Sequence, residues 1–201
     1  MVYEAYKTEI SGEPGPVFIE LPANLQLLTG EVDSMPAADI RLERPPLDDQ
    51  KIEAAVAMLS AAEKPGLFVG WGAKDVTDDL VRIAEHLGAP VSTTLQGLGV
   101  FPGDHPLHAG MGFGRSAVPA AEHAVRDCDV MLAVGTRFAE ICTGSYGAVP
   151  PEKLIHIDIN PGAIGANHTT PVGIHADSRD AVPALANALL DATDARDGST
   201  V

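Results

Sequence analysis

The 201-residue chain is poor in cysteine and in basic side chains and has no long apolar run, and each shortage excludes a class of protein. Its two cysteines, Cys128 and Cys142, form neither a metal-ligand spacing nor a disulfide framework, so we expect a reducing, cytoplasmic location. The 13 basic residues against 28 acidic ones give a net charge of −15, which repels nucleic-acid phosphates and anionic lipid. No run approaches the ~18 apolar residues of a membrane helix. The sequence therefore predicts neither nucleic-acid nor membrane binding.

Familiar catalytic and phosphate-binding motifs are also missing. No G-x-G-x-x-G follows a predicted strand, and there is no Walker A lysine loop. The turn Gly70-Trp71-Gly72 lacks the third glycine, so a tight strand-to-helix turn explains it better than a nucleotide fingerprint. His105 and His108 have no evident third ligand, which favours loop structure or an interface over a metal site. We therefore predict no metal ligands and no catalytic residues in this chain.

What the chain does have is a regular alternation of apolar segments. Short apolar runs at 130–134 and 154–159 are typical of strands covered on both faces. Segments whose apolar residues have helical spacing lie between most of the predicted strands. This order indicates an α/β fold with a mainly parallel sheet, helices on both faces and a Rossmann-like topology. The predicted strands are 66–70, 90–95, 129–134, 154–159 and 172–176. The predicted helices start at Asp48 or Asp49, at Asp75 or Thr77, at Val118, and at Asp177 or Ser178.

The rest of the chain divides into segments of different composition. Residues 1–30 hold one predicted helix (3–10) and one predicted strand (16–22), too little to bury a core, so we interpret them as the last elements of a preceding domain. Residues 31–47, rich in Pro, Ala and charge, are a predicted linker. The α/β domain covers 48–193, and 194–201 form a predicted disordered tail. Within the domain, the irregular segment 96–119 is expected to serve a site or an interface.

Polar residues follow several predicted strands, where open α/β sheets bind ligands. Thr94 and Gly97 offer a hydroxyl and a freely oriented amide. Arg137 can pair with a phosphate or with an acidic neighbour. Asp158 can accept from ribose hydroxyls or, with Asn160, hold the following turn. The residues alone leave these alternatives open.

Five stretches together resemble the central domain of thiamine-diphosphate-dependent enzymes of the acetolactate synthase type. They are 15–22, 88–94, 97–107, 134–138 and 156–161. The resemblance implies three α/β domains in sequence: pyrimidine-binding, central and diphosphate-binding. Residues 1–30 would then be the C-terminal remnant of the pyrimidine-binding domain. It also implies a homo-oligomeric lyase or transferase that uses thiamine diphosphate and Mg²⁺ to decarboxylate 2-keto acids or transfer the resulting acyl group.

The resemblance further implies that the flanking domains supply the catalytic groups. In the family, the catalytic glutamate lies upstream of this region, and the Gly-Asp-Gly motif that holds Mg²⁺ lies downstream. Here Gly103-Asp104 is followed by His105. We therefore expect that the chain does not activate thiamine diphosphate by itself.

In acetolactate synthases the central domain binds FAD, and in some relatives it binds ADP or nothing. The chain departs from the family pattern at Trp71, at Ile141 and at Gly112, where a third turn glycine, a second arginine and a histidine are usual. FAD, ADP and an empty site stay open, with a stand-alone FAD-, NAD- or ADP-binding module as the alternative hypothesis. Ten positions match the family's FAD contacts: Gly70, Gly72, Thr94, Leu95, Gly97, Gly110, Met111, Arg137, Asp158 and Ile159.

Overall fold

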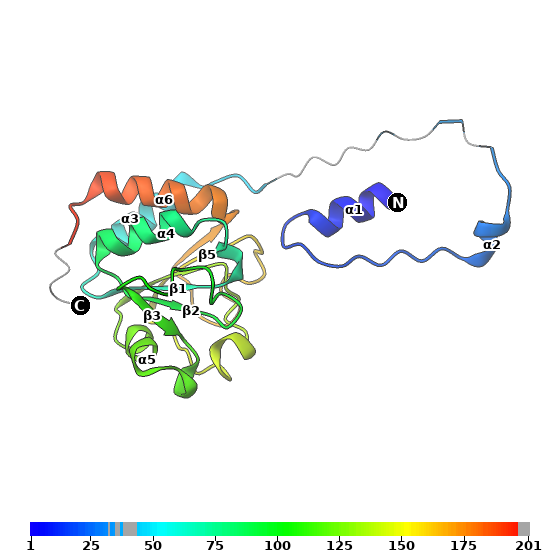
Figure 1. Ribbon diagram of the computed structural model, residues 1–201. Helices are drawn as coiled ribbons and strands as arrows, with labels where there is room; N and C mark the ends of the chain where they lie inside the picture. The colour runs from blue at the N-terminus through cyan, green and yellow to red at the C-terminus, as the bar shows by residue number, and fades with distance from the viewer. Residues whose placement is uncertain (32, 35–36, 38–43, 197–201) are drawn as a thin grey trace. The chain divides into compact units, whose positions relative to one another are not determined.

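The computed structural model describes residues 1–31, 33–34, 37 and 44–196 (Figure 1). The chain divides into two compact units, Met1–Arg44 and Pro45–Val201. We call them the N-terminal unit and the α/β unit and describe each by itself. Their boundary falls inside the predicted linker 31–47.

The α/β unit is built on a six-stranded sheet in which every neighbouring pair is parallel. The strand order is β3-β2-β1-β4-β5-β6, so the direction of winding reverses between β1 and β4. The predicted fold class is confirmed. The strands are β1 Pro65–Val69, β2 Val91–Thr93, β3 His108–Met111, β4 Val130–Val134, β5 Lys153–Asp158 and β6 Val172–His175.

Helices cover both faces of the sheet. Helices α3 (Asp49–Ser60), α4 (Thr77–Leu87) and α6 (Ser178–Ala192) lie on one face, and α5 (Pro119–Arg126) packs on β1 to β3 from the other (Figure 1). Because side chains alternate along a strand, Leu67 and Val69 enter the larger core under α3, α4 and α6. Phe68, between them, enters the smaller core with Val125 and Met131.

The helix ends show which sequence signals the fold uses. The Asp48 carboxylate accepts from the amides of Gln50 (3.1 Å) and Lys51 (3.3 Å), which caps α3 as predicted. Helix α4 ends at Gly88 in the left-handed region, also as predicted. It starts at Thr77, one of the two predicted residues, but the predicted capping by Asp75 or Thr77 is wrong: Val76 occupies the cap position, and the Thr77 hydroxyl donates to the Val100 carbonyl at 2.8 Å.

The segment 96–119 contains a strand that the sequence did not predict. β3 pairs with β2 in parallel at the edge of the sheet, with a register shift between Val91 and Ser92. All four β3 residues are only partly buried, and the strand includes Gly110 at φ +101°. The sequence of β3 therefore contains no apolar run, and its pairing with β2 is what identifies it as a strand.

The N-terminal unit has helices but no strand among its described residues. Helix α1 (Val2–Ile10) confirms the predicted helix, and α2 (Ala23–Leu27) is an additional short one. The predicted strand at 16–22 is wrong, because no partner strand pairs with it. Phe18 and Leu27 are 88% and 84% exposed, and no described residue of this unit is buried. Its origin in a pyrimidine-binding domain stays a prediction.

The segment after α6 contacts the α/β unit as far as Arg196. The Arg196 amide donates to the His86 carbonyl at 2.9 Å, and its guanidinium donates to the Ala62 carbonyl at 2.7 Å. These contacts hold the first residues of the segment predicted as a disordered tail, while 197–201 lie outside the described residues. None of the helices in the described part of the chain is long and apolar enough to cross a membrane.

Candidate functional site at the carboxyl edge of the sheet

All ten predicted binding residues lie at the end of the sheet where its parallel strands have their carboxyl ends, which we call the carboxyl edge. They lie at or just beyond the carboxyl ends of five different strands, which parallel pairing places side by side. Their role in binding a nucleotide stays a prediction. By strand, they are Gly70 and Gly72 after β1, Thr94, Leu95 and Gly97 after β2, Gly110 and Met111 in β3, Arg137 after β4, and Asp158 and Ile159 at the end of β5.

The turns after β1 and β4 touch at the point where the sheet reverses its winding. The Gly70 amide donates to the Val134 carbonyl at 2.9 Å, and the Gly72 amide donates to the Gly135 carbonyl at 3.2 Å. A Cβ at Gly70 would lie 2.2 Å from the Gly135 oxygen, and one at Gly135 would lie 2.5 Å from the Gly72 backbone. Gly135 also has φ +60°. The two backbones approach as closely as glycine allows.

These hydrogen bonds occupy backbone amides of the turn after β1. In a dinucleotide site of the Rossmann type, the amides at this position donate to the pyrophosphate. Besides the amides of Gly70 and Gly72, that of Ala73 donates to the Gly70 carbonyl and that of Lys74 to the Trp71 carbonyl, both at 3.1 Å. The long helix α4 begins only at Thr77. The geometry favours the interpretation of Gly70-Trp71-Gly72 as a tight turn.

The turn after β2 is likewise held from within. The Thr94 hydroxyl accepts from the Gly97 amide at 3.0 Å, and the Thr94 amide donates to the Val69 carbonyl at 2.9 Å. A Cβ at Gly97 would lie 2.7 Å from that same carbonyl oxygen. Thr94 therefore holds the turn, and its side chain is almost fully buried.

Apolar side chains are the exposed feature of this edge. Trp71 is 60% exposed, and Leu95 and Leu98 after β2 are 45% and 49% exposed. The Lys74 ammonium lies 5.7 Å from the centre of the Trp71 ring, a cation–π distance. An indole face beside aliphatic groups can pack against a planar ring.

Asp158 has the turn-holding role that its position allows. Its buried carboxylate accepts from the Asn160 amide at 2.8 Å, and the Asn160 side chain accepts from the Gly162 amide at 2.9 Å. The exposed Arg137 follows β4, and its carbonyl accepts from Asn167 Nδ2 at 3.0 Å. These hydrogen bonds favour the structural interpretation of Asp158. Pairing of Arg137 with a phosphate stays a prediction.

Beneath the β4 turn, two histidines pack around Phe138. The ring of Phe138 stacks on Phe68 at 5.4 Å and meets the edges of His156 at 5.5 Å and His168 at 5.1 Å. His156 Nε2 donates to the Thr136 carbonyl at 2.7 Å. Burial lowers the pKa of both imidazoles, and for His156 it outweighs the opposing effect of the Thr136 carbonyl. Sequence reasoning missed this cluster, whose members lie on separate segments.

His105, in the loop before β3, and His108, the first residue of β3, pack against neighbouring side chains. His105 Nε2 lies 3.3 Å from Glu85 Oε1, and its Nδ1 accepts from the Leu107 amide at 3.2 Å. Both His105 and His108 contact the ring of Phe101. Within the described residues, no three His, Cys, Asp or Glu side chains come together as metal ligands would.

Comparison with known proteins places this fold in a family. Residues 52–185 match the family model described as the thiamine pyrophosphate enzyme, central domain. The chain belongs to this family. The predicted resemblance is thereby confirmed, and thiamine diphosphate is the cofactor after which these enzymes are named.

Acetolactate synthases are among its curated relatives. A probable acetolactate synthase large subunit from Methanocaldococcus jannaschii is 38% identical over 199 residues, covering 92% of this chain and 33% of the relative. The large subunit from Corynebacterium glutamicum is 37% identical, covering 90% of this chain and 30% of the relative. The chain thus spans about a third of the length of these relatives.

Solved structures show the same fold. A putative thiamin diphosphate-dependent enzyme from Mycobacterium smegmatis superimposes with a TM-score of 0.74 and 26% identity, covering 99% of this chain and 38% of that one. A benzoylformate decarboxylase from Polynucleobacter necessarius gives a TM-score of 0.73 at 24% identity, covering 98% and 36% respectively. The second likeness concerns the fold alone.

Proposed function

We propose that this chain is the central domain of an acetolactate synthase-like enzyme that decarboxylates 2-keto acids and transfers the resulting acyl group. The match of residues 52–185 to the family's central domain carries the proposal. Since the chain spans about a third of its relatives, the activity of the whole enzyme is part of the proposal. So are flanking pyrimidine- and diphosphate-binding domains, Mg²⁺, a homo-oligomer and a cytoplasmic location, the last supported by two free cysteines.

In this proposal the chain supports the reaction and does not perform it. Bound thiamine diphosphate supplies an electron sink for the carbanion left by decarboxylation. Its diphosphate and Mg²⁺ are assigned to a flanking domain, since this chain contains no Gly-Asp-Gly motif: Gly103-Asp104 is followed by His105. The residues of this chain form a six-stranded sheet whose carboxyl edge presents Trp71 and Leu95.

FAD or ADP at the carboxyl edge is the second part of the proposal. Convergence of ten residues on this edge supports it, as do the exposed Trp71 and Leu95, which can pack on a planar ring. The amides of Gly70 and Gly72 already donate within the protein, so the pyrophosphate of FAD, ADP or NAD could bind to them only by displacing internal hydrogen bonds. The proposed nucleotide therefore contacts exposed side chains of this edge and not these two amides.

A domain exchange tests the first part. We would replace the central domain of the Methanocaldococcus jannaschii relative with residues 45–196 of this chain and measure turnover of pyruvate with thiamine diphosphate and Mg²⁺. We expect activity from the exchanged enzyme and none from this chain alone. The same enzyme without a central domain is the control. A folded, assembled exchange enzyme without 2-keto acid turnover contradicts the proposal.

Titration of this chain with FAD, ADP and NAD tests the second part, with Trp71 fluorescence as the reporter. Saturable quenching by FAD or ADP is expected, and Arg137→Gln should weaken it about tenfold through loss of a charge-assisted contact. Arg82→Gln on α4 is the matched control, since Arg82 pairs with Asp79 on the surface. Saturable binding of NAD but of neither FAD nor ADP would favour the stand-alone module.

A further inference from the structure

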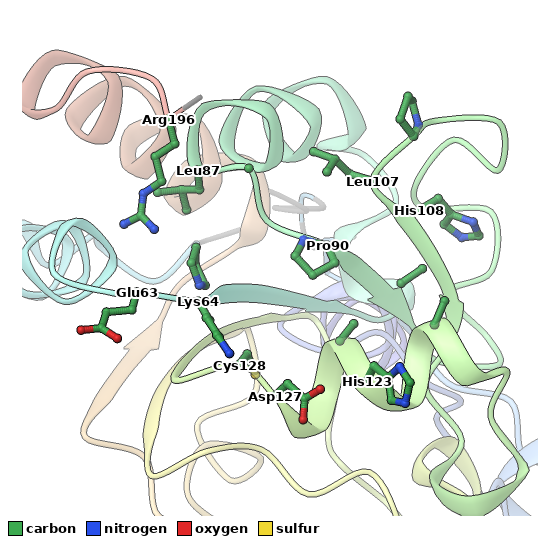
Figure 2. Close-up of a pocket in the computed structure, with 16 residues that line it drawn as sticks. Glu63, Lys64, Leu87, Pro90, Leu107, His108, His123, Asp127, Cys128 and Arg196 are labelled. Carbon is green, nitrogen blue, oxygen red and sulfur yellow. The ribbon is translucent and has the colours of Figure 1, made fainter. Parts of the chain in front are cut away.

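A cavity of about 510 Å³ lies at the amino edge of the sheet, the end opposite the candidate site (Figure 2). The segments leading into β1 to β4, the end of α4 and one side of α5 line it. Its volume falls within the ~300–1,000 Å³ typical of small-molecule sites. None of the ten residues at the carboxyl edge contributes to it, so an occupant here would be separate from any nucleotide there.

One wall of the cavity is mostly apolar, with the Arg196 side chain beside Leu87. Figure 2 shows Leu87, Pro90 and Leu107 on the side facing away from α5. Cys128 contributes a neutral thiol on the other side, because burial raises its pKa to about 12 and Sγ donates to the Val125 carbonyl at 3.2 Å. An aliphatic group would lose water-exposed area against this wall.

The facing wall carries charge, and Figure 2 shows Lys64, Asp127 and His123 along it. Arg126 pairs with Asp127 at 2.8 Å, and its hydrogen bond lowers the pKa of that carboxyl, with smaller contributions from His123 and Lys64. The Asp127 carboxylate is thus close to three basic side chains, and the cavity lining as a whole includes two carboxylates, Glu63 and Asp127, and the basic side chains of Lys64, His123 and Arg196. The ammonium of Lys64 forms no ion pair with any described residue.

We propose that this cavity binds a small aliphatic carboxylic acid, with its carboxylate between Lys64 and His123 and its carbon chain against Leu87, Pro90 and Leu107. A single negative charge suits Lys64, whereas a phosphate dianion would be repelled more strongly by Asp127 and would leave the apolar wall without a partner. An amine would face the Lys64 ammonium. The proposal does not depend on the proposed function.

Amide NMR of the whole chain tests it with four probes: hexanoate, hexanol, hexylamine and inorganic phosphate. Hexanoate should give saturable shifts at amides around the cavity, such as Gly88, Ala124 and Cys128, and none at Gly97 or Thr136 on the other edge. Hexanol, hexylamine and phosphate should each bind at least about fivefold more weakly, as expected for loss of about 1 kcal/mol of charge pairing or of apolar contact. Equal binding of hexanoate and hexanol overturns the proposal, and so does the absence of saturable shifts.

Substitutions locate the carboxylate. Lys64→Met keeps the aliphatic stem and should weaken hexanoate about fivefold while leaving hexanol unchanged. Lys74→Met is the matched control, because Lys74 pairs with Asp75 away from the cavity. If Lys64→Met folds normally and binds hexanoate as the parent does, the proposal is wrong; if it fails to fold, the four-probe comparison on the parent decides.

Discussion

The contact between the β1 and β4 turns predicts a graded series of glycine-to-alanine effects on stability. Replacing these glycines with alanine can lower the free energy of unfolding in two separate ways. The backbone can be left-handed, or there can be no room for a Cβ. Gly99 has neither, with nothing within 4 Å of an added Cβ, and Gly165 has only the first, at φ +77° with open space. Gly70 has only the second, with 2.2 Å to the Gly135 oxygen, and Gly135 has both.

The magnitudes follow from these two costs. An alanine in the left-handed region costs about 1–2 kcal/mol, and forcing a methyl group into closely packed atoms costs about 1–3 kcal/mol. Gly165→Ala should therefore cost about 1–2 kcal/mol and Gly70→Ala about 1–3 kcal/mol. Gly135→Ala should cost about 2–5 kcal/mol. Gly99→Ala should be neutral or stabilising by up to about 1 kcal/mol, since alanine restricts the unfolded chain.

Urea unfolding followed by far-UV circular dichroism measures the series, with Trp71 fluorescence reporting on the turn itself. Each 1 kcal/mol should also move Tm by about 2–4 °C in a unit of this size. The comparison of Gly135→Ala with Gly165→Ala tests whether the contact between the two turns is rigid, because both glycines have a left-handed backbone and only Gly135 is crowded. If Gly135→Ala costs no more than Gly165→Ala, the turns separate to admit a methyl group and the backbone contact is not rigid.

Two further predictions concern a helix cap and the buried histidines. Asp48→Ala removes the acceptor for the Gln50 and Lys51 amides and should lower the free energy of unfolding by about 1 kcal/mol, whereas Asp49→Ala should have less effect in the same urea titration. Burial lowers the pKa of His156 and His168 below the 6.5 of a free imidazole. This contribution to stability should therefore be full above about pH 7.5 and fall toward lower pH, as protons bind the unfolded chain preferentially. His156→Gln keeps a donor for Thr136 and should flatten that decline between about pH 7.5 and pH 5; an unchanged slope would show that other groups cause it.

The strands that the sequence predicted well are those whose own side chains identify them. β4 and β5 are apolar along most of their length because helices or loops cover both faces, and the predicted limits agree with the structure to within a residue at each end. β3 has no such signal: His108–Met111 is an edge strand that exists by pairing with β2. At 16–22 the opposite occurs, since an apolar run bounded by prolines has no partner strand among the described residues.

For the candidate site, topology was predictable and hydrogen bonding was not. Parallel strands separated by helices bring their carboxyl ends together, so the placement of Arg137 and Asp158 at one edge follows from the pattern. Whether the amides of Gly70 and Gly72 are available depends on Val134 and Gly135, which a distant strand brings beside them. No local pattern contains that information.

The same contact decides where a ligand would lie at the carboxyl edge. Doubly wound sheets bind ligands in the crevice between the loops that diverge at the reversal point. Here Gly70 and Gly135 bring those loops together, so a ligand must lie over the turns and contact exposed side chains such as Trp71 and Leu95. Glycine substitutions should then reduce stability, whereas Trp71→Leu should change ligand affinity and leave the urea midpoint, followed by circular dichroism, unaltered. A large loss of stability in Trp71→Leu would show instead that the indole supports the turn.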